Sequence, residues 1–140
     1  MRKLTLFATL AIAAALATGC AAAKAVVPAA GGTVNATLTD MKITVDRTSI
    51  AAGPVTFVVK NTGGMEHELV VIQTDVAQDK LATGDEAGKM DETGNLGETG
   101  TMIAGGSNTF TVTLPTGHYV LICNEVGHYT SGMHMAFTVN

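Results

Sequence analysis

The sequence predicts an all-β fold, a two-sheet antiparallel Greek-key β-sandwich, on three observations. Apolar and polar residues alternate with period two in several short segments, as they do in half-buried strands. Turn clusters rich in Gly, Pro and Asn separate these segments. The composition, with 16 Gly and 4% aromatic residues among 140, is typical of short strands joined by turns, and the length suits one domain with one core.

The N-terminal segment predicts export and attachment to a membrane. Residues 1–20 begin with Arg2 and Lys3, continue with a short apolar run and end at Cys20, the pattern of a signal peptide. The ending LATGC resembles a bacterial lipobox, which implies that Cys20 is lipidated; cleavage near Ala21 without a lipid is the alternative. We therefore expect a protein on the periplasmic or extracytoplasmic face, held by a lipid anchor.

Residues 21–32, AAAKAVVPAAGG, carry no alternating pattern and predict a flexible tether. The folded domain is expected from 33 to 140. Seven segments in it predict strands: 34–39, 41–45, 55–60, 67–72, 109–114, 118–123 and 136–140. Segments 67–72 and 118–123 are continuously apolar and predict central strands.

A long acidic, Gly-rich insertion at 74–107 interrupts the strand pattern. It carries seven acidic residues against two lysines, and a loop of this length requires a reason. We expect one or two helical turns over 75–81, a short extra strand over 101–104 and a mobile middle.

The charge of the chain excludes some partners. The net charge is −4, and loss of Arg2 and Lys3 with the signal would make it −6. Nucleic acid is not an expected partner, because phosphate binding draws on clustered Lys and Arg. An acidic protein instead favours partners with a basic docking face. We expect a monomer.

Four residues form a pattern of metal ligands. Residues 123–133, CNEVGHYTSGM, place Cys123, His128 and Met133 at C-x4-H-x4-M spacing after a central strand, and His67 heads another central strand. Two imidazoles, one thiolate and a weak thioether suit a copper ion that alternates between two oxidation states. Zinc would accept such ligands too, but a Met ligand favours the softer copper.

The segments NTGGMEHELVV and YVLICNEVGHYTSGMHMAFTV resemble the cupredoxin family of blue copper proteins, in particular bacterial plastocyanin-like and sulfocyanin-like members. The x4/x4 spacing is similar to that of rusticyanin. The resemblance implies that His67, Cys123, His128 and Met133 hold one type 1 copper, and that the edge of His128 reaches the surface, with Tyr129 and Met135 beside it. Glu68 follows His67 where many members have Asn or Ser, so Asn124 is the expected bridge between the two ligand loops.

Two functions fit these ligands. The first is a one-electron carrier in the cell envelope that exchanges electrons with redox protein partners. The second is a periplasmic copper carrier or store that delivers copper to an oxidase. An enzyme is not expected, because a copper oxidase or nitrite reductase needs a further copper centre with more His ligands, and the chain has 4 His. His118 and His134 have no place in the pattern and are expected to be exposed strand residues.

Overall fold

Residues 30–140 are described by a computed structural model and form a β-sandwich of nine strands. The predicted signal 1–20 with Cys20, and residues 21–29 of the predicted tether, lie outside the described residues. The strands are β1 (Gly32–Thr39), β2 (Lys42–Val45), β3 (Ser49–Ile50), β4 (Gly53–Asn61), β5 (Val70–Gln73), β6 (Asn95–Glu98), β7 (Ser107–Leu114), β8 (Gly117–Ile122) and β9 (His134–Val139). The described part of the chain contains no helix that could cross a membrane.

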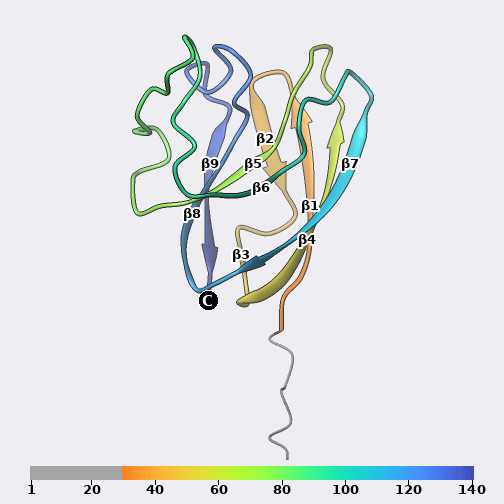
Figure 1. Ribbon diagram of the computed structural model, residues 1–140. Coiled ribbons are helices and arrows are strands. Elements are labelled where there is room, and N and C mark those ends of the chain that lie inside the picture. The colour runs from red at the N-terminus through yellow and green to blue at the C-terminus, as the bar shows by residue number, and fades with distance from the viewer. Residues whose placement is uncertain (1–29) are drawn as a thin grey trace, which may run out of the picture.

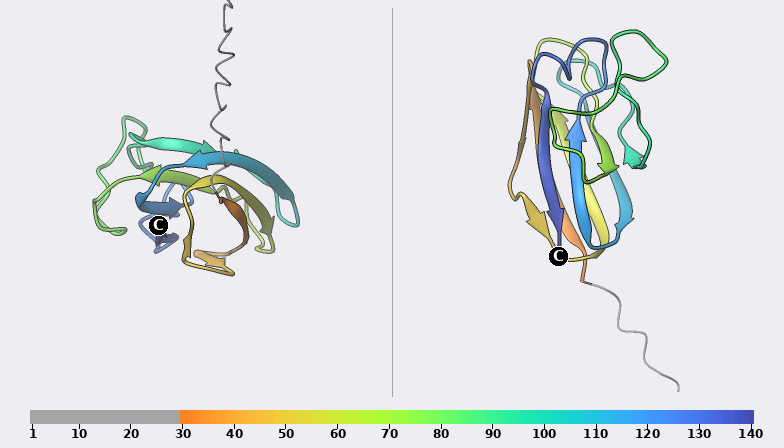
Figure 2. Two further views of the ribbon diagram at one scale, coloured as in Figure 1. Left: turned by 90° about the horizontal axis from the view of Figure 1, so that it is seen from below. Right: turned by 90° about the vertical axis from the view of Figure 1, so that its left-hand side faces the viewer.

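The strands form two sheets, which confirms the predicted sandwich (Figures 1 and 2). The first sheet has the order β2-β1-β4-β7 and the second the order β3-β9-β8-β5-β6. The sheets are mixed rather than purely antiparallel as predicted, because β1 pairs with β4 and β3 pairs with β9 in parallel. The chain visits β3 in the second sheet between β2 and β4, so β4 returns beside β1 in the same direction.

The core between the sheets consists of the apolar residues that alternate along the strands. In β1 and β4 the predicted inward residues are fully or almost fully buried: Val34, Ala36, Leu38, Val55, Phe57 and Val59. Phe57 stacks on Phe110 of β7 with ring centroids 5.2 Å apart. Met41, which the sequence placed in a strand, instead lies in the β1–β2 turn with a φ of 61°.

A second apolar cluster covers the outer face of β5 and β8. Val70 and Ile72 of β5 and Val120 and Ile122 of β8 point outward, yet they are buried because Met90 and Tyr129 pack on them. Both faces of these strands are therefore covered. This explains why the sequence is continuously apolar there, whereas strands with one solvated face alternate.

The segment 74–107 supplies Met90 and Leu81 to this outer layer, whereas Tyr129 comes from the β8–β9 loop. The segment forms turns over 75–81 rather than the predicted helix, and Met102 makes an isolated bridge with His67 rather than part of an extra strand. It also contributes β6, which pairs with β5 and was not predicted. With Gly97 in β6 and two residues in β3, neither strand carries a period-two apolar signal.

Three loops meet at the end of the sandwich opposite the C-terminus. They are the β1–β2 turn, the β4–β5 loop and the β8–β9 loop (Figure 1). The predicted ligands lie in or next to the last two of these loops.

Candidate metal centre

Three of the predicted ligands meet at this end of the molecule. His67 Nδ1 lies 3.2 Å from His128 Nδ1. Cys123 Sγ lies 3.8 Å from His67 Nδ1 and 3.4 Å from His128 Nδ1. Such a group of donor atoms within 4.8 Å of one another has the size of a metal site. The prediction that strands over fifty residues apart bring these side chains together is confirmed.

Hydrogen bonds of the main chain fix His67. Its N–H donates to the carbonyl of Met102 and its carbonyl accepts from the N–H of Met102, at 3.1 and 2.8 Å. One residue later the N–H of Glu68 points to Cys123 Sγ at 3.4 Å. The backbone around His67 is therefore tied both to the 102 segment and to the thiol.

The ligand loop is closed by its own backbone. Cys123 directly follows β8, and its N–H donates to the carbonyl of Met133 at 3.0 Å. Met133 N–H in turn donates to the carbonyl of His128 at 3.1 Å. Three predicted ligands are therefore linked through the main chain, and the side chain of Met133 is fully buried.

The donors differ in their access to solvent. His67, Cys123 and Met133 are fully buried, whereas His128 is partly exposed. Of the four predicted ligands, His128 is therefore the one that reaches the surface, as the family resemblance implied.

Burial sets the protonation of the metal-free donors. Burial raises the pKa of the Cys123 thiol, although the N–H of Glu68 opposes the shift. Burial and then the neighbouring His67 lower the pKa of His128, which favours the neutral imidazole. A metal would replace the thiol proton and accept lone pairs from neutral rings.

The donor triangle fits a first-row transition metal. A point equidistant from the two nitrogens and the sulfur lies about 2.0 Å from each, close to the ~2.0–2.3 Å of metal–nitrogen and metal–sulfur bonds in proteins. Two imidazoles and a thiolate in a trigonal set, with a buried thioether nearby, are the donors of an electron-transfer copper site.

Asn61, at the end of β4, supports the site and was not predicted. Its fully buried amide donates to the carbonyls of Met65, Met102 and Ile103 at 2.8, 3.0 and 3.1 Å. It thus joins the β4–β5 loop to the segment that pairs with His67. The available signal was an Asn before a Gly turn, but such residues also end strands with no role in a site.

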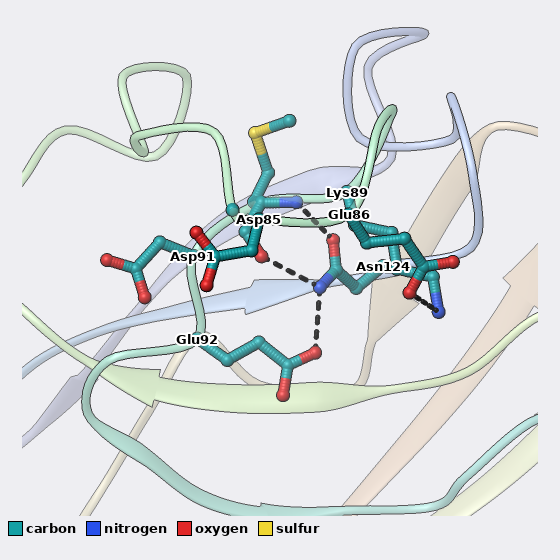
Figure 3. Close-up of a pocket in the computed structure, with 8 residues that line it drawn as sticks. Asp85, Glu86, Lys89, Asp91, Glu92 and Asn124 are labelled. Carbon is teal, nitrogen blue, oxygen red and sulfur yellow. Dashed lines mark hydrogen bonds and ion pairs between the residues drawn. The ribbon is translucent and has the colours of Figure 1, made fainter.

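Asn124 does not bridge the two ligand loops as predicted. Its amide oxygen accepts from Met90 N–H at 2.7 Å, and its nitrogen donates to Met90 O at 3.1 Å and Glu92 at 2.7 Å. Figure 3 shows Asn124 and Glu92 in this arrangement. Asn124 therefore ties the ligand loop to the 74–107 segment, and the Gly127 N–H reinforces the tie by donating to Gly88 O at 2.9 Å.

Tyr129 is not part of an exposed rim, contrary to the prediction. Tyr129 is buried. Its hydroxyl donates a hydrogen bond to Gln78 O at 2.8 Å and accepts one from Leu81 N–H at 2.9 Å. The ring of His134 packs against the Tyr129 ring in a tilted arrangement with ring centroids 4.8 Å apart. His134 is half-buried, so its predicted exposure is also wrong. His118 is exposed as predicted.

Glu68 replaces the usual polar neighbour of the first histidine by a buried acid. Burial raises its pKa to about 7, and Glu125, Glu92 and Glu98 add to the shift. A carboxyl group with a raised pKa therefore lies next to the centre.

The comparisons with known proteins agree with this centre. Residues 30–140 match the family model for the copper binding proteins of the plastocyanin/azurin family. Among solved structures, auracyanin from Roseiflexus castenholzii has a TM-score of 0.58 at 23% identity over 81% of this chain and 98% of its own. Auracyanin B has a TM-score of 0.60 at 25% identity over 78% and 88%. Rusticyanin from Thiobacillus ferrooxidans has a TM-score of 0.59 at 19% identity over 77% of each chain.

A search of curated protein sequences gives no significant match. The fold and the site nevertheless define a mononuclear copper protein. The chain belongs to the plastocyanin/azurin family of copper-binding proteins, the cupredoxins. Its cofactor is copper, and His67, Cys123, His128 and Met133 form its candidate single copper site.

Proposed function

We propose that this protein is a one-electron carrier of the cell envelope. The observation that carries the proposal is the unequal burial of the ligands: three are fully buried and only the His128 ring reaches solvent. A buried, multiply hydrogen-bonded ligand set changes little between oxidation states. A partly exposed imidazole gives electrons a short path to a docked partner.

The same observation distinguishes this function from copper delivery. A copper carrier has to exchange its ion, which favours exposed ligands, whereas Cys123 and Met133 are fully buried here. The test mixes the copper-loaded protein with a redox partner and, separately, with a high-affinity copper acceptor. Electron cycling much faster than copper loss supports the carrier. Faster transfer of the ion would favour copper delivery. If the protein transfers neither electrons nor copper, both functions are contradicted.

The partner is proposed to dock at the loop end around His128. Three exposed apolar side chains come from segments near the ligands: Met65 from the β4–β5 loop, Ile103 from the β6–β7 connection next to Met102, and Val126 from the β8–β9 loop. They are 42%, 66% and 58% exposed. They replace Tyr129 as the apolar surface for brief contact. Val126→Glu should slow electron exchange while the visible spectrum stays the same. The matched control is Val58→Glu on β4, at 39% exposure, which should leave the exchange rate unchanged.

The acidic 74–107 segment is proposed to attract a basic face of the partner. Such attraction raises the association rate and weakens as salt increases. Asp85→Asn with Glu86→Gln removes two exposed charges and should reduce the salt dependence. Deleting residues 84–97 is unsuitable, because it would remove part of β6 and expose Val70 and Ile72. An unchanged salt dependence would place the attraction elsewhere.

Attachment through Cys20 is proposed from the sequence pattern. A lipidated protein partitions with membranes, and Cys20→Ala should release it or alter its processing. One acyl chain binds only marginally, so stable anchoring rests on the several chains of a lipoprotein. A wild-type protein found wholly in the soluble fraction would contradict the anchor.

A further inference from the structure

The β1–β2 turn places a carboxylate against the outer nitrogen of a copper ligand. Asp40 Oδ1 lies 3.1 Å from His67 Nε2, while Nδ1 of the same ring faces Cys123 and His128. The His67 side chain is fully buried, and that of Asp40 is 50% exposed. Asp40 was given no role by the sequence pattern.

The parallel pairing of β1 with β4 brings these groups together. Leu38 of β1 is in register with Asn61 of β4, and Thr62 N–H extends the contact by donating to Leu38 O at 2.8 Å. Both strands run to the same end, so Asp40 emerges beside the loop that leads to His67. Gly64 N–H then donates to Asp40 Oδ1 at 3.0 Å and holds the carboxylate in place.

Gly63 provides the space for this contact. A Cβ atom at this residue would overlap Asp40 Oδ1 and come within 2.9 Å of His67 Nε2. Met41, next to Asp40, adopts a φ of 61°, a left-handed conformation that a methionine rarely takes. Gly63, where close approach requires a glycine, and Met41, with its disfavoured backbone conformation, thus both lie next to the pair of Asp40 and His67.

We propose that Asp40 positions His67 and tunes the copper through it. The carboxylate accepts a hydrogen bond from Nε2–H, which keeps the proton on Nε2 and leaves the Nδ1 lone pair free for the metal. Carboxylate partners of this kind fix the tautomer of a ligating histidine and raise its basicity. The negative charge also favours Cu(II) over Cu(I), and solvent around the half-exposed carboxylate weakens this effect.

Two variants separate the hydrogen bond from the charge. Asp40→Asn keeps an oxygen that can accept from Nε2–H but removes the charge, whereas Asp40→Ala removes both. Asp75→Asn is the control, because it also removes one charge from an exposed carboxylate that contacts a histidine. Its partner, His118, lies near the start of β8, whereas Cys123 follows the end of that strand. All three are made in the full chain and compared with wild type.

The first measurement does not depend on copper. NMR of the imidazole nitrogens in the metal-free protein should show His67 protonated at Nε2 in wild type and in Asp40→Asn. Asp40→Ala should give a mixture of both tautomers. A wild-type ring protonated at Nδ1, or an unchanged Asp40→Ala ring, would overturn the positioning role.

The second measurement is the reduction potential. Second-layer changes cost about 10- to 100-fold in metal affinity, and half exposure places Asp40 at the low end. We expect Asp40→Asn to lower the affinity for Cu(II) relative to Cu(I) by up to about tenfold. For a one-electron couple this raises the reduction potential by up to about 59 mV. Asp75→Asn should leave it unchanged. Equal potentials in wild type and both Asp40 variants would overturn the tuning role.

The inference rests on the proposed electron-carrier function, but the two fail separately. A protein that cycles no electrons would contradict the function, while the tautomer of His67 would still test whether Asp40 positions the ring.

Discussion

Cys123 is a buried free cysteine whose sulfur faces polar groups. Most such thiols pack as inert hydrophobic groups. Here the sulfur lies against the N–H of Glu68 and the Nδ1 atoms of His67 and His128. One N–H and two imidazoles around the sulfur distinguish Cys123 from a thiol that only packs among apolar groups, and they are the surroundings that a bound metal ion requires.

The first prediction tests the thiolate. Addition of Cu(II) should give an intensely coloured species, because the Cys123 sulfur transfers charge to copper in a trigonal site. Cys123→Ser should abolish the colour, since a hydroxyl replaces the thiolate donor. The visible absorption spectrum of both proteins is the measurement. A mutant that retains the wild-type spectrum would show that the ligand assignment is wrong.

The second prediction concerns Met133. Met133→Leu should keep the copper and the colour and raise the reduction potential, because a weak donor to Cu(II) is lost. The change conserves volume, so its cost in stability should stay below about 1.5 kcal/mol. Voltammetry measures the potential. Met135→Leu, two residues on and half-buried, is the control; a shift in that variant instead would move the axial ligand to Met135.

Individual residues differ in how far the sequence predicts them. The C-x4-H-x4-M spacing and His67 are recognisable because ligand chemistry restricts residue type and order. Asp40 and Asn61 are not, since each is an ordinary turn residue until the strands are paired. Their roles depend on the parallel register of β1 and β4, and period-two patterning carries no information on whether neighbouring strands are parallel.

At the scale of elements, the 74–107 segment is a third layer that is fastened to the ligand loop. Asn124, Gly127 and Tyr129 all bond to it, and Met90 packs on the outer face of β5 and β8. The sequence predicted the insertion from its acidic and Gly-rich composition. It did not predict the layer, because its apolar anchors, Leu81 and Met90, are too few and too widely spaced to form a pattern.

The third prediction tests this fastening. Asn124→Ala leaves the buried N–H and carbonyl of Met90 unpaired, so the free energy of unfolding should fall by about 1–3 kcal/mol. Chemical denaturation of the metal-free protein measures the change. Asn108→Ala, an exposed Asn that bonds Thr99 O at 2.7 Å, should cost much less. Equal losses in the two variants would mean that the Asn124 contacts add nothing specific to the fold.

At the scale of the whole molecule, stability should depend on pH through Glu68. The pKa of this carboxyl is about 7 in the folded protein and 4.5 in a model compound, and burial is the main cause. The folded state therefore binds the proton more tightly than the unfolded state. From Glu68 alone, the free energy of unfolding is highest below pH 4.5, falls as the pH rises from 4.5 to 7 and is constant above that range.

The fourth prediction follows from this sign. Glu68→Gln keeps the shape and removes the ionisation, so the metal-free variant should match wild type at pH 4 and exceed it above pH 7, by up to about 3 kcal/mol. Urea denaturation of both proteins between pH 4 and 8, with Cys123 kept reduced, measures the difference. Titrating groups that do not interact with Glu68 affect both proteins alike, so the difference between the two curves reports on Glu68 together with its interactions with Glu125, Glu92 and Glu98. If the two curves run parallel over the whole range, the pKa of Glu68 is the same in the folded and the unfolded protein. A neighbouring group or access of solvent would then offset the effect of burial on this carboxyl.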